Sequence, residues 1–212
     1  MELTMSKRMA AMQPSAIREI FKNLTDPTVI PFAGGNPSQE AFPVKELENI
    51  SRIVFENNPI TALQYSISEG YPQLREAAKQ FANSREPGLT HPGDGIIITS
   101  GAQQAIDLAA KCLVNDEDVI LCENPSFIGA LNAFRTCRAK LVGIDVEADG
   151  ISLEGLEAAI RENPRAKLLY VIPNFQNPTG ATMSQQKRQG VYELCRQAGI
   201  VILEDNPYGD PR

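Results

Sequence analysis

The chain has 212 residues, 42% hydrophobic and 22% charged, and its net charge of −6 at pH 7 argues against a nucleic-acid-binding face. A single histidine, and four cysteines without Cys-x-x-Cys spacing, argue against a metal site, and the cysteines are expected to be buried reduced thiols. Since the chain has neither an apolar run of membrane-spanning length nor the apolar core of a signal peptide, a cytoplasmic protein without membrane contact is expected.

The first part of the chain, up to about Pro92, has the pattern of helices and loops. A short helix is predicted over 14–24, and a loop over 32–42. Apolar residues recur at helical spacing over 47–54 and again over 74–81, which predicts two amphipathic helices.

From Gly95 onward, short apolar runs alternate with amphipathic helices. The runs cover 96–99, 119–122, 140–144, 168–172 and 200–203. Continuous apolar strands separated by helices are typical of a parallel sheet that is covered on both faces. The predicted fold class is therefore α/β, a mainly parallel sheet with helices on both faces, preceded by a helical N-terminal segment.

Polar and aromatic residues directly follow four of these runs. They occupy 100–104, 123–127, 173–180 and 204–208. Parallel sheets bind ligands beyond the carboxyl ends of their strands, so these four turns are expected to meet at one edge of the sheet. That convergence predicts a ligand site more strongly than any single turn does.

Each turn allows a structural and a functional interpretation. A helix that begins at Gly101 can bind a phosphate through its free amides, or it can be an ordinary helix start. Phe127 can lie against a planar ligand or belong to the core, and Asn177 can point its amide into a site or complete an Asn-Pro turn. Asp205 can balance a protonated ring nitrogen or cap a helix, while Tyr208 can hydrogen-bond a ring hydroxyl.

Taken together, these motifs resemble the fold-type I aminotransferases, which depend on pyridoxal phosphate. The resemblance rests on Ser100-Gly101-Ala102-Gln103, Pro125-Ser126-Phe127, Asn177-Pro178-Thr179-Gly180 and Asp205-x-x-Tyr208, with Phe32-Ala33-Gly34-Gly35 and the segment 63–75 upstream. The amino-acid sequence of 174–177 and 204–206 most resembles the 2-aminoadipate and kynurenine aminotransferase branch.

The resemblance implies a site for pyridoxal 5′-phosphate. The implied cofactor residues are Gly101, Ala102, Gln103, Phe127, Asn177, Asp205, Tyr208 and Tyr65. The amides of the first three would hold the phosphate, and Phe127 would stack on the pyridine ring at a position where many relatives have Tyr. Asp205 would pair with the protonated pyridine nitrogen, while Asn177 and Tyr208 would hydrogen-bond the ring oxygen. These last three residues form the implied catalytic set.

The resemblance also implies partners. Tyr65 would reach the phosphate of a neighbouring subunit, so a homodimer with shared sites is expected. Gly34 and Gly35 would line the substrate pocket. Arg18 would meet a distal carboxylate of the substrate, although a solvated helix face explains this arginine equally well. The implied reaction, a step of amino acid metabolism, is transamination between an amino acid and a 2-oxo acid, neither of which the sequence identifies.

The implied domains are an N-terminal arm with the substrate-pocket loop over 1–45 and part of the cofactor-binding large domain over 46–212. In the family, the lysine that holds the cofactor and a small C-terminal domain lie beyond the Asp-x-x-Tyr turn, whereas this chain ends at Arg212. The 212-residue chain alone is therefore expected to be inactive. The alternatives are the effector domain of an aminotransferase-like transcription regulator, a non-catalytic binding fragment, and a lyase or decarboxylase with the same cofactor.

Overall fold

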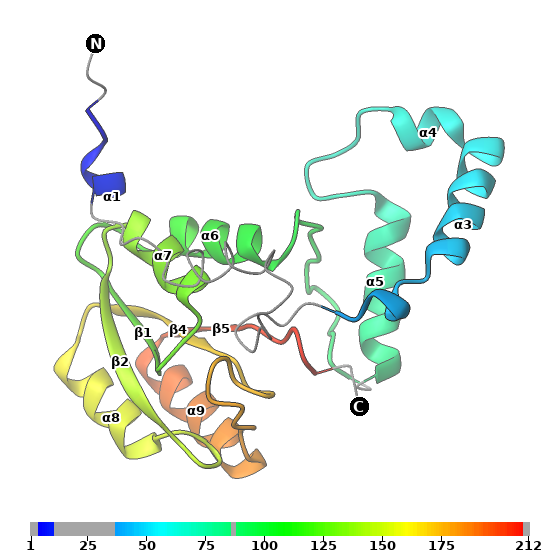
Figure 1. The fold of residues 1–212 in the computed structure, drawn as a ribbon. Helices are drawn as coiled ribbons and strands as arrows, with labels where there is room; N and C mark the ends of the chain where they lie inside the picture. Colours follow the sequence, from blue (N-terminus) through cyan, green and yellow to red (C-terminus); the bar gives the residue numbers. More distant parts are fainter. Residues whose placement is uncertain (1–3, 11–36, 86–87, 210–212) are drawn as a thin grey trace, which may run out of the picture. The chain divides into compact units, whose positions relative to one another are not determined.

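The computed structural model describes residues 4–10, 37–85 and 88–209 (Figure 1). The chain divides into two compact units, one formed by Met1–Ser15 with Ser100–Arg212 and the other by Ala16–Thr99. The helix predicted over 14–24 lies outside the described residues, as does most of the loop predicted over 32–42. Within the described ranges, no helix is both long enough and apolar enough to span a membrane.

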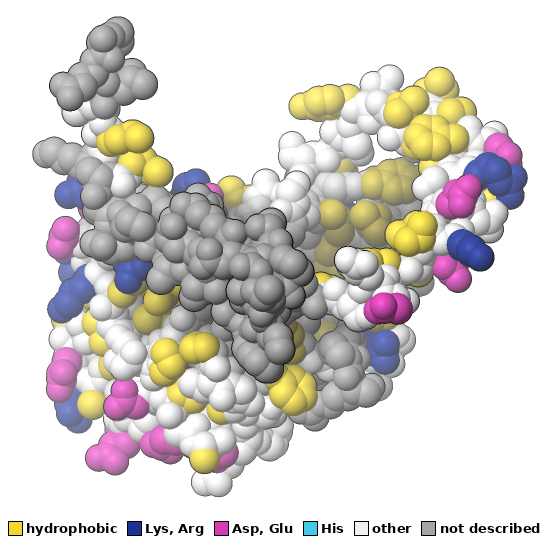
Figure 2. All heavy atoms as spheres, in the orientation of Figure 1, with side chains coloured by type: hydrophobic (Ala, Val, Ile, Leu, Met, Phe, Trp, Pro, Cys, Tyr) yellow, Lys and Arg dark blue, Asp and Glu magenta, His cyan; other side chains and the backbone are white. Residues whose placement is uncertain are grey.

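The second unit is helical in its described part, as predicted. Its elements are η2 (Gln39–Ala41), α3 (Val44–Asn57), α4 (Pro59–Leu63) and α5 (Pro72–Arg85). The helices α3 and α5 cover the two segments in which apolar residues recur at helical spacing. Neither helix has a buried residue, and hydrophobic side chains gather on the surface of this unit (Figure 2).

The strand predicted over 96–99 does not form. The Ile98 amide donates to the Glu69 carbonyl at 2.9 Å, and the Ile96 carbonyl accepts from Arg75 Nε at 2.5 Å. The run is thus bonded to a loop and to a side chain of α5 instead of to another strand. An apolar run becomes a strand only when neighbouring backbone groups pair with it, and periodicity alone does not report that pairing.

The first unit contains the predicted sheet. Its strands are β1 (Val119–Asn124), β2 (Lys140–Glu147), β3 (Gly150–Ile151), β4 (Ala166–Val171) and β5 (Val201–Glu204). The strand order is β3-β2-β1-β4-β5, in which β1 pairs in parallel with β2 and β4, and β4 with β5. Only β3 is antiparallel, and its two residues are too few to give a sequence pattern. The mainly parallel sheet is confirmed.

Helices cover both faces of this sheet, also as predicted (Figure 1). They are α6 (Ala102–Leu113), α7 (Ile128–Thr136), α8 (Leu153–Glu162) and α9 (Gln185–Ala198). Alternate strand residues pack on opposite sides. Ile120 and Tyr170 belong to the core cluster that α6 and α7 share, whereas Leu121 and Leu169 belong to the cluster of α8 and α9. A sheet that is buried on both faces explains the continuous apolar runs.

Local signals fix the ends of two helices. The Ser152 hydroxyl accepts from the Gly155 amide at 3.3 Å and caps α8, a role that serine favours. Gly199 follows α9 with φ 67°, a left-handed conformation that favours glycine and ends the helix before β5. The end of α9 directs the chain into β5, which leads to Asp205.

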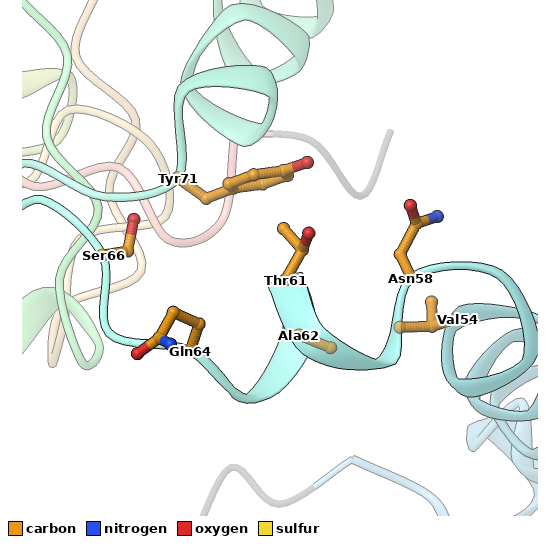
Figure 3. A pocket seen from close by; sticks show the side chains of 7 residues that line it. All are labelled: Val54, Asn58, Thr61, Ala62, Gln64, Ser66 and Tyr71. Carbon is orange, nitrogen blue, oxygen red and sulfur yellow. The ribbon is translucent and has the colours of Figure 1, made fainter.

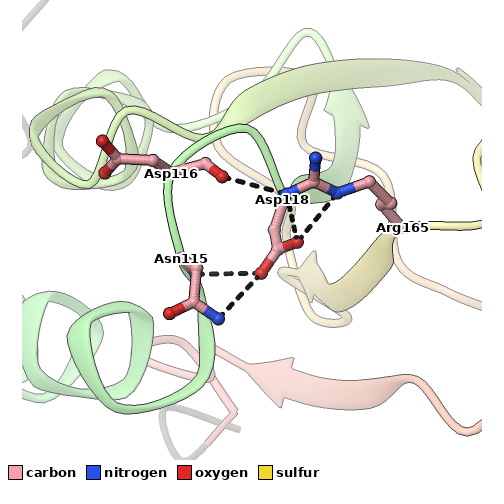
Figure 4. A network of polar contacts seen from close by, with 4 residues as sticks. All are labelled: Asn115, Asp116, Asp118 and Arg165. Atoms are coloured by element: carbon pink, nitrogen blue, oxygen red, sulfur yellow. Dashed lines mark hydrogen bonds and ion pairs between the residues drawn. The ribbon is translucent and has the colours of Figure 1, made fainter.

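A buried carboxylate fixes the amino end of β1 (Figure 4). Asp118 is 4% exposed, and its Oδ2 accepts from the Asn115 amide at 2.9 Å. Arg165 donates to Oδ1 of Asp118 through Nε at 3.2 Å and through NH2 at 3.0 Å, and it also binds the Asp116 carbonyl. The Asn115 amide, followed by Arg165, holds the pKa of Asp118 below its usual value. This charged network therefore anchors the end of β1 opposite to the predicted ligand edge.

An ion cluster joins α9 to the β2–β3 hairpin. Lys187 is 8% exposed, and its Nζ lies 2.6 Å from Glu147 Oε2 and 3.0 Å from Asp149 Oδ1. The same ammonium group donates to the Gly150 carbonyl at 3.1 Å. Because Gly150 is itself buried, its carbonyl depends on a protein donor.

Replacing Lys187 with methionine is expected to lower the free energy of unfolding by about 2 kcal/mol, because the buried carbonyl loses its donor while the two exposed carboxylates return to water. Urea denaturation measures the change. Lys111→Met is the matched control, since Lys111 is exposed on α6 and forms only a surface ion pair with an i,i+4 partner. Equal stabilities of the two variants would contradict the role of the cluster.

Candidate functional site

A cavity of about 220 Å³ lies in the first unit, where α6 begins and where β4 and β5 end. We call it the strand-end cavity. It is lined by Ala102, Gln103, Ile106, Phe127, Ile172, Asn177, Asp205, Pro207 and Tyr208. Four separate turns contribute to this lining, in agreement with the expectation that they meet at the carboxyl edge of a parallel sheet.

Six of the predicted cofactor residues line this one cavity. They are Ala102, Gln103, Phe127, Asn177, Asp205 and Tyr208. Gly101 directly precedes Ala102 in the chain. Tyr65 lies in the other unit and is 96% exposed. Gly34, Gly35 and Arg18 lie outside the described residues, so their assignment to the substrate stays a prediction.

The start of α6 forms one wall. Gly101 occupies the N-cap position with φ 83° and ψ 165°, a conformation that disfavours any residue with a Cβ. No side chain caps the helix, and within the described residues the amides of Ala102 and Gln103 have no acceptor. The positive end of the helix dipole adds to these free donors, so this wall suits an anion.

The turn before α7 forms a second, aromatic wall. Phe127 is half-buried at the N-cap position of α7. A Cβ built on Gly129 would lie 2.5 Å from the Phe127 ring and 2.7 Å from Gln103 Oε1, so only glycine leaves room for both side chains. Gln103 Nε2 donates to the Gly129 carbonyl at 3.1 Å and links this wall to α6.

Asp205 brings a carboxylate to the end of β5. Its backbone amide donates to the Val171 carbonyl at 2.9 Å, which continues the β4–β5 ladder by one residue. Its Oδ2 accepts from the Tyr170 hydroxyl at 2.7 Å, whereas the described residues provide no partner for Oδ1. Burial, followed by the bond to Asp205, raises the pKa of Tyr170 above its usual value, so this phenol remains a donor. One carboxylate oxygen is therefore fixed by the protein and the other is left for a ligand.

Asn177 and Tyr208 complete the polar lining. Asn177 lies in the loop after β4, and Tyr208, 38% exposed, lies in the loop after β5. Asn174 Nδ2 donates to Asn206 Oδ1 at 2.8 Å, a bond that joins these two loops. The amide of Asn177 and the phenol of Tyr208 can each hydrogen-bond a polar atom of a ligand.

The sequence alone assigns no individual role to some residues of the site. Ile106, Ile172 and Pro207 line the cavity, although the two isoleucines were expected only as apolar helix and strand residues. Tyr170 was hidden inside an apolar run, and its contact with Asp205 spans 35 positions. The available signal is a single side chain with a polar group in the middle of an otherwise aliphatic run.

A second hollow, of about 410 Å³, lies in the helical unit (Figure 3). Its lining consists of Val54, Asn58, Thr61, Ala62, Gln64, Ser66 and Tyr71. This lining contains amides and hydroxyls but neither a carboxylate nor a cation, so it offers no counter-charge for an ionic ligand. The strand-end cavity is therefore the better candidate for chemistry.

Comparisons with known proteins agree with this geometry. The profile of the family "Aminotransferase class I and II" matches residues 27–210. Aromatic-amino-acid aminotransferase 1 of Thermococcus litoralis is 36% identical over 98% of the chain, and 2-aminoadipate transaminase of Thermus thermophilus is 37% identical over 93%. The chain spans 50% and 48% of these two relatives, or about half their length.

Solved structures give the same result. The crystal structure of Pyrococcus horikoshii kynurenine aminotransferase in complex with PMP superposes with a TM-score of 0.91 at 32% identity, over 98% of this chain and 52% of that one. An uncharacterized HTH-type transcriptional regulator of Escherichia coli is also similar, at 32% identity over 87% of this chain and 39% of its own length. With a family profile that covers most of its length, the chain belongs to the aminotransferase class I and II family.

Proposed function

We propose that this chain provides the cofactor-binding half of a pyridoxal-phosphate-dependent aminotransferase. The observation that carries the proposal is that the Asp205 carboxylate and the uncapped start of α6 open into the same cavity. An anion site and a carboxylate at two ends of one cavity match a ligand that has a phosphate at one end and a cationic ring nitrogen at the other. The complex of a related enzyme with PMP supports this choice of cofactor.

The residues of the cavity fit pyridoxal phosphate. The amides of Ala102 and Gln103, with Gly101 shaping the approach, would hold the phosphate at the positive end of α6. Phe127 would lie against the ring, and Asp205 Oδ1 would accept from the protonated ring nitrogen. When bound, the cofactor supplies an electron sink for the amino acid's Cα.

The chain's own groups would prepare that chemistry in three ways. Asp205, fixed through Tyr170, keeps a proton at the ring nitrogen, because an ion pair favours the charged form. Phe127 and Ile172 exclude water from the ring faces and strengthen the ion pair. Asn177 and Tyr208 would donate to the ring oxygen and fix the in-plane orientation of the ring.

The reaction we propose is amino transfer between an amino acid and a 2-oxo acid, with Gly34, Gly35 and Arg18 as the proposed substrate contacts. We further propose a homodimer in which Tyr65 reaches the partner's cofactor phosphate. The exposure of Tyr65 at 96% and the apolar, unburied surface of α3 support an additional partner on the helical unit. Sedimentation equilibrium tests the dimer, and fractionation of cells tests the proposed cytoplasmic location.

Titration of the 212-residue chain with pyridoxal 5′-phosphate tests the proposed function. We expect saturable binding at one site per chain, competition by inorganic phosphate, and a change in the absorbance spectrum of the bound ring. If the folded chain bound no more pyridoxal 5′-phosphate than an unrelated protein does, the proposal would be contradicted. That result would then favour a binding fragment that is indifferent to this cofactor.

Gly129→Ala is expected to weaken binding of pyridoxal phosphate by about fivefold, which corresponds to about 1 kcal/mol. The new methyl group would occupy the space of the Phe127 ring edge, so the ring has to leave its position over the cavity. Isothermal titration measures the change. Gly155→Ala on α8 is the control, because its Cβ would meet side-chain atoms at 3.2 Å and more, away from the cavity. An unchanged affinity in Gly129→Ala would exclude Phe127 as a stacking residue.

The effector domain of a transcription regulator is the second candidate, favoured by the similarity to the HTH-type regulator of Escherichia coli. Under this alternative the same cavity binds the cofactor, and the gene encodes a DNA-binding domain ahead of Met1. Sequencing the gene upstream of the region that encodes Met1 separates the two candidates, since an aminotransferase has no such domain.

A further inference from the structure

A buried glutamine connects two walls of the strand-end cavity. Gln176 is 2% exposed, and both groups of its amide are fully engaged. Its Nε2 donates to Glu123 Oε2 at 3.1 Å and to the Pro125 carbonyl at 2.8 Å. Its Oε1 accepts from the Thr179 amide at 2.9 Å and from the Thr179 hydroxyl at 2.8 Å. Two donors and two acceptor positions are the complete capacity of a carboxamide.

The partners of Gln176 belong to different loops. Thr179 lies in the same loop as Asn177, the neighbour of Gln176 and a residue of the cavity wall. Pro125 lies in the turn that leads to Phe127, the aromatic wall. The Gln176 side chain therefore bridges the loop after β4 and the turn after β1 over a sequence separation of 51 residues.

Glu123 orients this bridge. It is the last but one residue of β1 and is 2% exposed, and its Oε2 also accepts from the amide of Ile172, which lines the cavity. Within the described residues no cation pairs with this carboxylate. Since its carboxyl accepts from the Gln176 amide, it determines which end of that amide faces β1. The amide oxygen is thereby left to face Thr179.

We propose that Gln176, oriented by Glu123, is a positioning residue that sets the gap between Phe127 and Asn177 and so determines the affinity of the cavity for an aromatic ring. This inference rests on the proposed function. Three wall residues are linked to the network. Ile172 is linked through its amide, Asn177 through its chain neighbour Gln176, and Phe127 through Pro125, two residues before it. Within the described residues, the hydrogen bonds of Gln176 and Glu123 join them to each other, to Pro125, Ile172 and Thr179, and not to Ala102 or Gln103 at the start of α6, where the phosphate would lie. We therefore expect the network to act on the ring alone.

The network is expected to affect binding of the ring and not binding of the phosphate group, so two probes test the proposal directly in the 212-residue chain. Gln176→Met keeps the length of the side chain and removes its hydrogen bonds. We expect the dissociation constant for pyridoxal 5′-phosphate to rise about tenfold, because the two ring contacts lose their fixed spacing. The inhibition constant of inorganic phosphate, measured by competition, should stay unchanged. Gln189→Met on the exposed face of α9 is the matched control and should change neither constant.

Two results would overturn the inference in a folded variant: an unchanged affinity for pyridoxal phosphate, or an equal loss of affinity for both probes. If Gln176→Met does not fold, Thr179→Val decides. It removes the hydroxyl that donates to Gln176 Oε1 and accepts from the exposed Ala181 amide, and it keeps the Thr179 amide as a donor to Gln176. It should raise the dissociation constant for pyridoxal phosphate about threefold and leave phosphate inhibition unchanged. Failure of the unmodified chain to bind the cofactor would instead contradict the proposed function.

Discussion

Asp205→Asn is expected to weaken binding of pyridoxal 5′-phosphate about 50-fold, since a charge-assisted hydrogen bond is replaced by a neutral one in a partly buried site. Asparagine preserves the size of the side chain, and its carbonyl oxygen can still accept from the Tyr170 hydroxyl. The free Oδ1 is what changes, because it becomes an amide group that cannot accept from a protonated ring nitrogen. The variant should therefore retain its fold and lose the counter-charge.

Equilibrium titration followed by absorbance measures this effect, and the spectrum adds a second readout. A ring that has lost its proton absorbs differently from a protonated ring, so the bound spectrum of Asp205→Asn should change as well as the affinity. Asp145→Asn is the control, because Asp145 is an exposed residue of β2 whose carboxylate accepts from Asn124 outside the cavity lining. Equal affinities of the two variants would remove Asp205 from the proposed cofactor site.

The positions at the edge of the sheet could be predicted from the sequence for a simple physical reason. A strand that packs on both faces is apolar throughout, so the polar residues in the turn that follows it mark the edge. Asp205 and Asn177 follow such runs, and both line the cavity. Periodicity thus identifies which residues reach the edge without any knowledge of the order of the strands.

The interactions beneath that edge could not be predicted in this way. Glu123 and Gln176 are 53 positions apart and meet because β1 pairs with β4 in a particular register. Sequence periodicity contains no information on register between distant strands. The same limit explains the wrong prediction over 96–99, which has the composition of a strand but pairs with no strand among the described residues.

Buried carboxylates also differ in their electrostatics in ways that the sequence does not reveal. Asp118 is charged because Asn115 and Arg165 bind it, and their hydrogen bonds lower its pKa. Glu123 is equally buried, but its donors among the described residues are neutral, the Ile172 amide and the Gln176 amide. Burial is the largest influence on Glu123 and raises its pKa from 4.5 to about 7. Two similar acidic residues at opposite ends of β1 thus respond differently to pH.

This difference predicts that the chain loses stability as the pH rises from about 4.5 to about 7. Between pH 4.5 and about 7, the folded chain holds a proton on Glu123 that the unfolded chain releases, so raising the pH favours unfolding. The full loss is about 3 kcal/mol, the free energy of a shift of this size. Its titratable neighbours stay uncharged in this range, because burial raises the pKa of Cys122 to about 11 and that of Tyr170 above its usual value.

Glu123→Gln should remove this part of the pH dependence, since glutamine binds no proton in either state. Its carbonyl oxygen can accept from the same two amides, while its unpaired NH2 group costs about 1–3 kcal/mol at every pH. The slope of unfolding free energy against pH is therefore the quantity to compare, measured by urea denaturation from about pH 5 to about pH 8. Glu157→Gln on the exposed face of α8 should keep the parent slope. If Glu123→Gln kept it too, Glu123 would be charged in the folded chain throughout, and its two amide donors would have to stabilise a full buried charge.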